Sequence, residues 1–221
     1  MTEQEIQQAL DDIAELKKSV KGHMRFMTSI LMDRKFIWFS IAAAVFSGFF
    51  FSAIGLMAVR FGSFNAIPGE IKIVLAGILI LFIGLSGVYK TRIISRNIAR
   101  RNASFTYRDL FRDSEFTALF SVMYAGMFAV IVTGAVIGSR LNDLWILLPF
   151  ISLYYAFIIA LFAIVFLTPA YFITAGFSAA FGLAALLFMK SHHFFWLAAW
   201  MVILMLSFAG SIAAATRKKA P

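Results

Sequence analysis

Residues 144–189 read LWILLPFISLYYAFIIALFAIVFLTPAYFITAGFSAAFGLAALLFM, a run of 46 residues without a formal charge. As a single helix this run would be about 69 Å long, whereas the hydrocarbon core of a bilayer is roughly 30 Å thick. Thr168 and Pro169 interrupt the run near its middle. The run therefore predicts two membrane-spanning helices joined by a tight turn.

The composition of the whole chain supports a membrane protein. Of its 221 residues, 62% are hydrophobic and 14% are charged, against about 25% charged in soluble domains, and the mean hydropathy is +0.87. A soluble domain of this size cannot bury that much apolar surface, so lipid must solvate most of it. The absence of cysteine from the sequence excludes disulfides, thiolate metal sites and cysteine nucleophiles.

Six apolar segments predict an all-α fold, a polytopic membrane bundle of six transmembrane helices. The predicted spans are residues 36–59, 71–89, 116–139, 144–167, 170–189 and 194–216. The first segment has 24 uncharged residues, which is too long for the core of a cleavable signal peptide. We therefore expect a cytoplasmic segment 1–35, a membrane domain 36–216 and a basic tail 217–221.

The distribution of positive charge predicts the orientation. Sixteen of the 20 lysine and arginine residues lie in the N-terminal segment, in the loop 90–115 or in the C-terminal tail. The other four flank the opposite ends of the spans: Arg60, Lys72, Arg140 and Lys190. The positive-inside rule then places both termini in the cytoplasm, in the inner membrane of a cell. The net charge of +9 is explained by this orientation, so we expect no nucleic-acid partner.

Residues 1–35 predict an amphipathic helix, for which Thr2 and Glu5 have the spacing of a capping box. Apolar residues occupy most a and d positions of its heptads: Ile6, Ala9, Ile13, Leu16, Val20, Met27 and Ile30. One interpretation is a short coiled coil through residues 3–31 that forms a homo-oligomer or binds a membrane-protein partner. The other is a single helix lying on the bilayer, since residues 24–35 mix apolar and basic side chains.

The loop 90–115 is the most basic segment and interleaves its charges with apolar residues. Arg92, Arg96, Arg100 and Arg101 recur at spacings of four or five and are predicted to contact anionic lipid head groups of the bilayer. The alternative is that these charges only set the orientation of the spans. Thr106 to Asp109 is predicted to cap a short interfacial helix.

Two patterns resemble metal sites. Asp109 and Asp113 would share a helix face, where paired carboxylates hold Mg²⁺ in some phosphotransfer enzymes, but Arg108 and Arg112 are placed to form ion pairs with them. His192 and His193 have no third ligand nearby in the sequence, and catalytic zinc needs three. We expect ion-paired and interfacial roles, with no metal, cofactor or catalytic residue. The spans also lack charged residues away from their ends, which disfavours proton- or sodium-coupled transport.

Small residues at helical spacing predict close helix packing. They are Gly48 and Ser52 with Ala44, Gly134 and Gly138, and Gly176 and Ala180 with Ala184. Hydroxyl side chains in the spans predict either a weakly polar cavity or hydrogen bonds between helices: Tyr124, Thr133, Ser152, Tyr154 and Tyr155.

These features favour a non-enzymatic accessory, scaffold or sensor subunit of the membrane. A small permease for an apolar or weakly polar solute is the alternative, through a cavity lined by the hydroxyls. A lipid-modifying enzyme that uses Asp109 and Asp113 is a further alternative.

Overall fold

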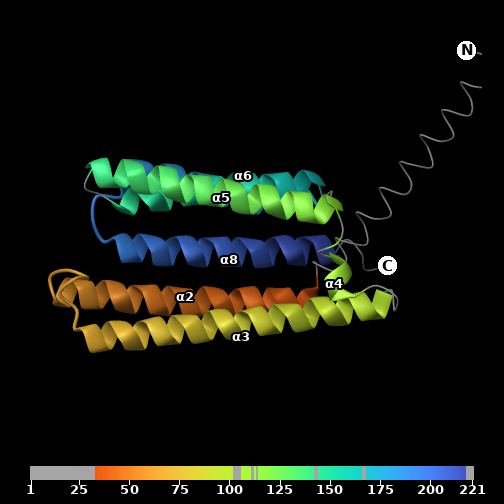
Figure 1. Ribbon diagram of the computed structural model, residues 1–221, viewed down its shortest axis with the longest axis horizontal. Coiled ribbons are helices and arrows are strands. Elements are labelled where there is room, and N and C mark those ends of the chain that lie inside the picture. Colours follow the sequence, from red (N-terminus) through yellow and green to blue (C-terminus); the bar gives the residue numbers. More distant parts are fainter. Residues whose placement is uncertain are drawn as a thin grey trace, which may run out of the picture.

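The computed structural model describes residues 33–101, 106–110, 112, 114–141, 144–165 and 168–217. These residues form six long helices: α2 (Arg34–Arg60), α3 (Gly69–Arg101), α5 (Ser114–Leu141), α6 (Leu147–Val165), α7 (Tyr171–Phe188) and α8 (His193–Arg217) (Figure 1). Two short helices complete the described elements, α4 (Tyr107–Leu110) and the 3₁₀ turn η1 (Leu144–Ile146). All six long helices are long and apolar enough to cross a membrane, which confirms the predicted helical membrane bundle. The predicted N-terminal helix falls almost entirely outside the described residues.

The long helices run side by side along one axis (Figure 1). The closest pairs are α2 with α8 and α6 with α7, and contacts between α7 and α8 join the two pairs. Helix α5 packs on α6, and α3 lies beside α2, where the rings of Phe46 and Phe82 stack at 3.8 Å. In the most apolar stretch of α3 no residue is buried, and in that of α5 only 6% of the residues are buried. These two helices therefore form the periphery of the bundle.

Hydroxyl pairs fix how the central helices face one another. Ser152 Oγ of α6 donates to the Ser178 carbonyl of α7 at 2.8 Å, and Ser178 Oγ returns a bond of 2.8 Å to the Ser152 carbonyl. Near the start of α7, the Thr174 and Ser211 hydroxyls lie 2.8 Å apart. All four side chains are buried. Because lipid offers no other partner to a hydroxyl, these bonds select one face of α7 as the inner face.

The turn between α6 and α7 is built on Thr168 and Pro169. The Thr168 amide donates to the Ala163 carbonyl at 2.9 Å, and the Thr168 carbonyl accepts from the Tyr171 amide at 3.0 Å, where α7 begins. Pro169 lies in the turn before the helix, where its missing N–H removes no helical bond.

Helix α3 is longer than the predicted second span. Residues 90–101, predicted as the start of a loop, continue the helix for about 18 Å beyond the apolar segment. The segment contains no glycine or proline, and its Ile93 and Ile98 side chains are 4% and 1% exposed. Burial of these two residues explains why the helix persists among so many charges.

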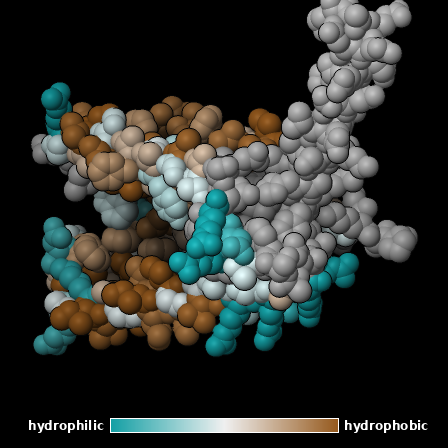
Figure 2. Space-filling model, turned by 45° about the vertical axis from the view of Figure 1, so that its right-hand side comes forward, coloured by the Kyte–Doolittle hydropathy of each residue, from teal (hydrophilic) through white to brown (hydrophobic). Residues whose placement is uncertain are grey.

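Ile93 belongs to a cluster in which five helices meet. It is buried with Phe36 of α2, Ala163 of α6, Tyr171 of α7 and Ile212 of α8. We call this the basic end of the bundle, because α2 begins there with Arg34 and Lys35 and α3 continues through Lys90, Arg92, Arg96 and Arg100. In Figure 2 hydrophilic side chains gather toward the two ends of the described helices, and hydrophobic ones cover the surface between them.

Candidate functional site

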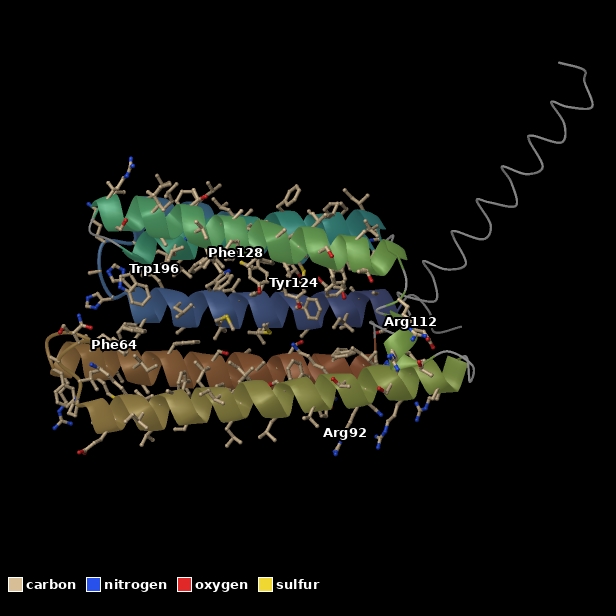
Figure 3. All side chains as sticks on the ribbon, in the orientation of Figure 1. Phe64, Arg92, Arg112, Tyr124, Phe128 and Trp196 are labelled. Carbon is tan, nitrogen blue, oxygen red and sulfur yellow. The ribbon has the colours of Figure 1, made fainter. Side chains whose placement is uncertain are left out.

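A pocket of about 310 Å³ lies at the basic end, between the start of α2 and the charged part of α3. Its lining combines three cations, one aromatic ring and one aliphatic side chain: Lys35, Arg92, Arg96, Tyr89 and Ile93. Arg92 and Arg96 are one helical turn apart on α3, whereas Lys35 comes from the first turn of α2. The labelled Arg92 side chain points away from the neighbouring helices (Figure 3).

Aromatic contacts hold the wall of this pocket in place. The Tyr89 ring stacks on Phe39 of α2, with ring centroids 5.8 Å apart. The Lys90 ammonium lies 4.9 Å from the centroid of the same Phe39 ring, within the range of a cation–π contact. These contacts join α2 and α3 at the level of the pocket.

The structure separates the four arginines that the sequence groups together. Arg92, Arg96 and Arg100 are exposed on α3, but only Arg92 and Arg96 line the pocket. Arg101 is the last residue of α3, and its side chain lies outside the described residues. Lys35 joins the site from residues 24–35, which the sequence predicts as an interfacial segment, but no spacing along the chain identifies it as a neighbour of Arg92.

Asp109 has a capping role, as predicted. Its carboxylate accepts a bond of 2.7 Å from the Thr106 amide and one of 2.6 Å from the Thr106 hydroxyl, at the start of α4. These bonds, and then the charges of Arg112 and Arg108, lower the pKa of Asp109. Asp113 lies outside the described residues, and the described ranges contain no group of three side chains able to hold a metal.

Acidification should release this cap. A carboxylate whose pKa is lowered by folding stabilises the folded form above its unfolded pKa, and that contribution is lost as the pH falls through the folded pKa. We expect the amide resonance of Thr106 to titrate with a midpoint below the ordinary aspartate value of about 4. An Asp109→Asn variant should show no such step, and a wild-type midpoint above about 4 would contradict the assignment.

The histidine pair lies at the opposite end of the bundle, among aromatic rings. His193 stacks on Trp145 with centroids 4.9 Å apart, and Phe194 meets Trp145 edge-on at 4.8 Å. His192 has a φ of 57°, in the turn before α8. Phe64 and Trp196 are also found at this end (Figure 3). The arrangement is that of an aromatic membrane-interface belt.

The hydroxyl side chains predicted to line a polar cavity are divided among different surroundings. The Tyr154 hydroxyl donates to the Met123 carbonyl of α5 at 2.7 Å, and Ser152 bonds to Ser178. Tyr155 meets Trp200 edge-on. Tyr124 is 65% exposed on α5, beside the exposed Phe128 (Figure 3), and Thr133 is also exposed. The Ser152 and Tyr154 hydroxyls therefore bond α6 to its neighbours α7 and α5.

The small residues predicted at helix contacts also differ in position. An added Cβ on Gly48 would lie 2.9 Å from Val202 of α8, and one on Gly134 would meet Leu147. Gly138 is buried and Ser52 half-buried. Gly176 and Ala180 instead lie on the exposed side of α7, and an added Cβ on Gly176 would meet nothing within 4 Å. These two residues therefore do not pack against another described helix, because the bonds of Thr174 and Ser178 turn the other face of α7 inward. Contacts of this stripe with a second protein stay a prediction.

No protein-family model matches this chain, and no curated protein or solved structure is significantly similar to it. The residues and their geometry are thus the basis for inferring a function.

Proposed function

We propose that this six-span membrane protein is a non-enzymatic accessory or scaffold subunit that holds its N-terminal helix at the cytoplasmic face of the inner membrane. The observation that carries this proposal is the use of hydroxyl groups inside the bundle. Ser152, Ser178, Thr174 and Ser211 bond to one another or to carbonyls of the facing helix. The hydrogen bonds of these hydroxyls thus stabilise contacts between helices.

The same observation weakens the permease alternative, which requires a continuous polar path across the described helices. The described spans also lack charged residues near their centres, where ion coupling places them. The lipid-modifying enzyme loses support as well, since the Asp109 carboxylate already accepts two bonds from Thr106. An apolar bundle whose hydroxyls bond to one another agrees best with the function of a rigid anchor.

The proposed orientation places the basic end and both termini in the cytoplasm. Alkaline phosphatase is active only outside the cytoplasm, so its fusion to Pro221 should give no activity. A fusion at Phe64, in the loop between α2 and α3, should be active and serves as the control. Activity at Pro221 equal to that at Phe64 would contradict the proposed orientation.

The scaffold proposal requires a stable assembly formed through residues 3–31. Native mass measurement of the full chain in mild detergent should show a homo-oligomer or a stoichiometric complex, rather than one chain of 24.6 kDa. Placing Glu at the heptad positions Ile13 and Val20 should dissociate the assembly, because it introduces charge into an apolar seam. Gln7→Glu with Gln8→Glu adds the same charge outside the a and d positions and should leave it intact. A monomeric wild type, or equal masses for both variants, would overturn the proposal.

A further inference from the structure

We propose that the pocket of Lys35, Arg92 and Arg96 binds the phosphate group of an anionic phospholipid whose acyl chain lies along one exposed stripe of α3. This site goes beyond the scaffold function, which needs an assembly but no particular lipid. It is also narrower than a general attraction of the basic segment for the membrane, because it assigns the phosphate to three side chains from two helices.

The chemistry of the pocket suits a phosphate. Arginine presents a planar fork of donors that pairs with two phosphate oxygens, and lysine adds a compact charge. Arg92 and Arg96 lie one turn apart on the same side of α3, a spacing from which both can reach one anion. The Arg92 side chain points away from the neighbouring helices (Figure 3), so it must turn toward Lys35 when the phosphate binds. Asp33, which precedes Lys35 by two residues, accepts the Lys35 amide at 2.8 Å as the cap of α2. Among the described residues that line the pocket, three are positively charged and none is acidic.

The size of the pocket fits a head group. A volume of about 310 Å³ is at the small end of the range for ligand sites, roughly 300–1,000 Å³. The acyl chains of a phospholipid must then lie outside it. Tyr89 and Ile93 complete the lining with an amphipathic ring and an aliphatic side chain. A tyrosine ring is favoured at the boundary between head group and hydrocarbon, because one end is apolar and the other is wet.

A continuous apolar stripe leads away from the pocket along α3. Val88, Leu85, Leu81 and Ile78 precede Arg92 at alternating intervals of four and three residues, the spacing of one helix face. The exposed fraction of the side chain is 52% for Val88, 62% for Leu85, 63% for Leu81 and 42% for Ile78. The ten residue steps from Val88 to Ile78 span about 15 Å, half of the roughly 30 Å hydrocarbon core. The stripe therefore has the length of one leaflet and starts at the phosphate site.

Arg100 provides a matched control for the site. It continues the same series of arginines, at four residues from Arg96, and is exposed on the same helix. It does not line the pocket. A diffuse electrostatic attraction depends on both arginines equally, whereas a discrete site depends on Arg96 and not on Arg100.

The experiment compares lipid binding to the delipidated full chain in detergent, by native mass measurement with phosphatidylglycerol or with phosphatidylcholine of identical chains. Wild type should retain phosphatidylglycerol preferentially. Lys35→Gln, Arg92→Gln and Arg96→Gln should each weaken this binding by tenfold or more, whereas Arg100→Gln should weaken it by fivefold at most, as expected for one exposed charge near a lipid surface. Arg96→Lys keeps the charge but loses the fork and should bind between wild type and Arg96→Gln.

Three additions make the result decisive. Helical content and unfolding midpoint are measured for each variant, and Leu81→Asn, on the apolar stripe, should weaken phosphatidylglycerol binding without removing any charge. Inorganic phosphate and glycerol phosphate, tested as competitors, should displace the lipid poorly because they lack chains. Equal losses for Arg96→Gln and Arg100→Gln, or no preference for phosphatidylglycerol, would overturn the site. Tight binding of inorganic phosphate with full displacement of lipid would overturn its assignment to a phospholipid.

Discussion

Replacing Gly182 with leucine should destabilise the bundle by about 1–3 kcal/mol, the usual cost of overpacking a well-packed interior. Gly182 is buried on α7 at its contact with α6. An added Cβ would lie 2.8 Å from Leu153 Cγ and 3.2 Å from the Leu153 backbone nitrogen. The Leu153 side chain can rotate, but its backbone cannot move without shifting α6. The same shift would stretch the reciprocal hydrogen bonds between Ser152 and Ser178. Ser152 is next to Leu153 in the sequence, and Ser178 lies one helical turn before Gly182.

Gly176→Leu is the control for this prediction. Gly176 lies on the same helix but is exposed, with no atom within 4 Å of an added Cβ. Its substitution should change the free energy of unfolding by about 0.5 kcal/mol or less, as for surface positions in general. The measurement is reversible unfolding of both variants in mixed detergent micelles. Equal destabilisation would mean that α7 presents a different face to α6, or that Gly176 packs against a second protein.

Ile212→Ala should destabilise the protein by about 2 kcal/mol. Ile212 is 0% exposed and lies in the cluster with Phe36, Ile93 and Tyr171, where α8 meets α2, α3 and α7. Large-to-small changes in protein cores cost roughly 2–5 kcal/mol. We expect the low end of this range, because the unfolded protein keeps the side chain in an apolar micelle and only the packing contacts are lost.

The same substitution at an exposed isoleucine is the control, because it changes the residue type without removing buried contacts. Ile80→Ala removes the same atoms from α3, where Ile80 is 69% exposed, and should have little effect in the same unfolding experiment. A loss at Ile212 no larger than that at Ile80 would contradict the five-helix cluster at the basic end.

Helix length shows what hydropathy predicts and where it stops. The charge-free segments predict all six spans and, apart from the end of α3, their limits within a few residues, because hydrocarbon excludes charge and requires each spanning segment to bond its own backbone. Hydropathy does not predict the extension of α3 past Tyr89. The charged side chains of residues 90–101 need water, and outside the hydrocarbon core hydropathy does not indicate where a helix ends. The burial of Ile93 and Ile98 decides where the helix ends, and Ile93 packs against four other helices at the basic end.

The choice of inner face on α7 shows a second limit. The spacing of Gly176, Ala180 and Ala184 and that of Thr174, Ser178 and Ala185 both describe a possible packing face. The structure turns the second inward, because Ser178 and Thr174 find partners on α6 and α8. A hydrophobic pattern cannot choose between faces on a helix that is apolar on all sides.

The sequence by itself therefore determined the number of spans, their approximate limits and the end of the bundle at which positive charge collects. Each of these follows from the transfer of a residue between water and hydrocarbon, which is a property of the chain. The tertiary structure decided which faces meet and which side chains share a site. Lys35 lies 57 positions before Arg92 in the sequence, and only the stacking of α2 on α3 brings them to one pocket. Such contacts depend on shape and on partners from other helices, and a residue's own hydropathy carries no information about either.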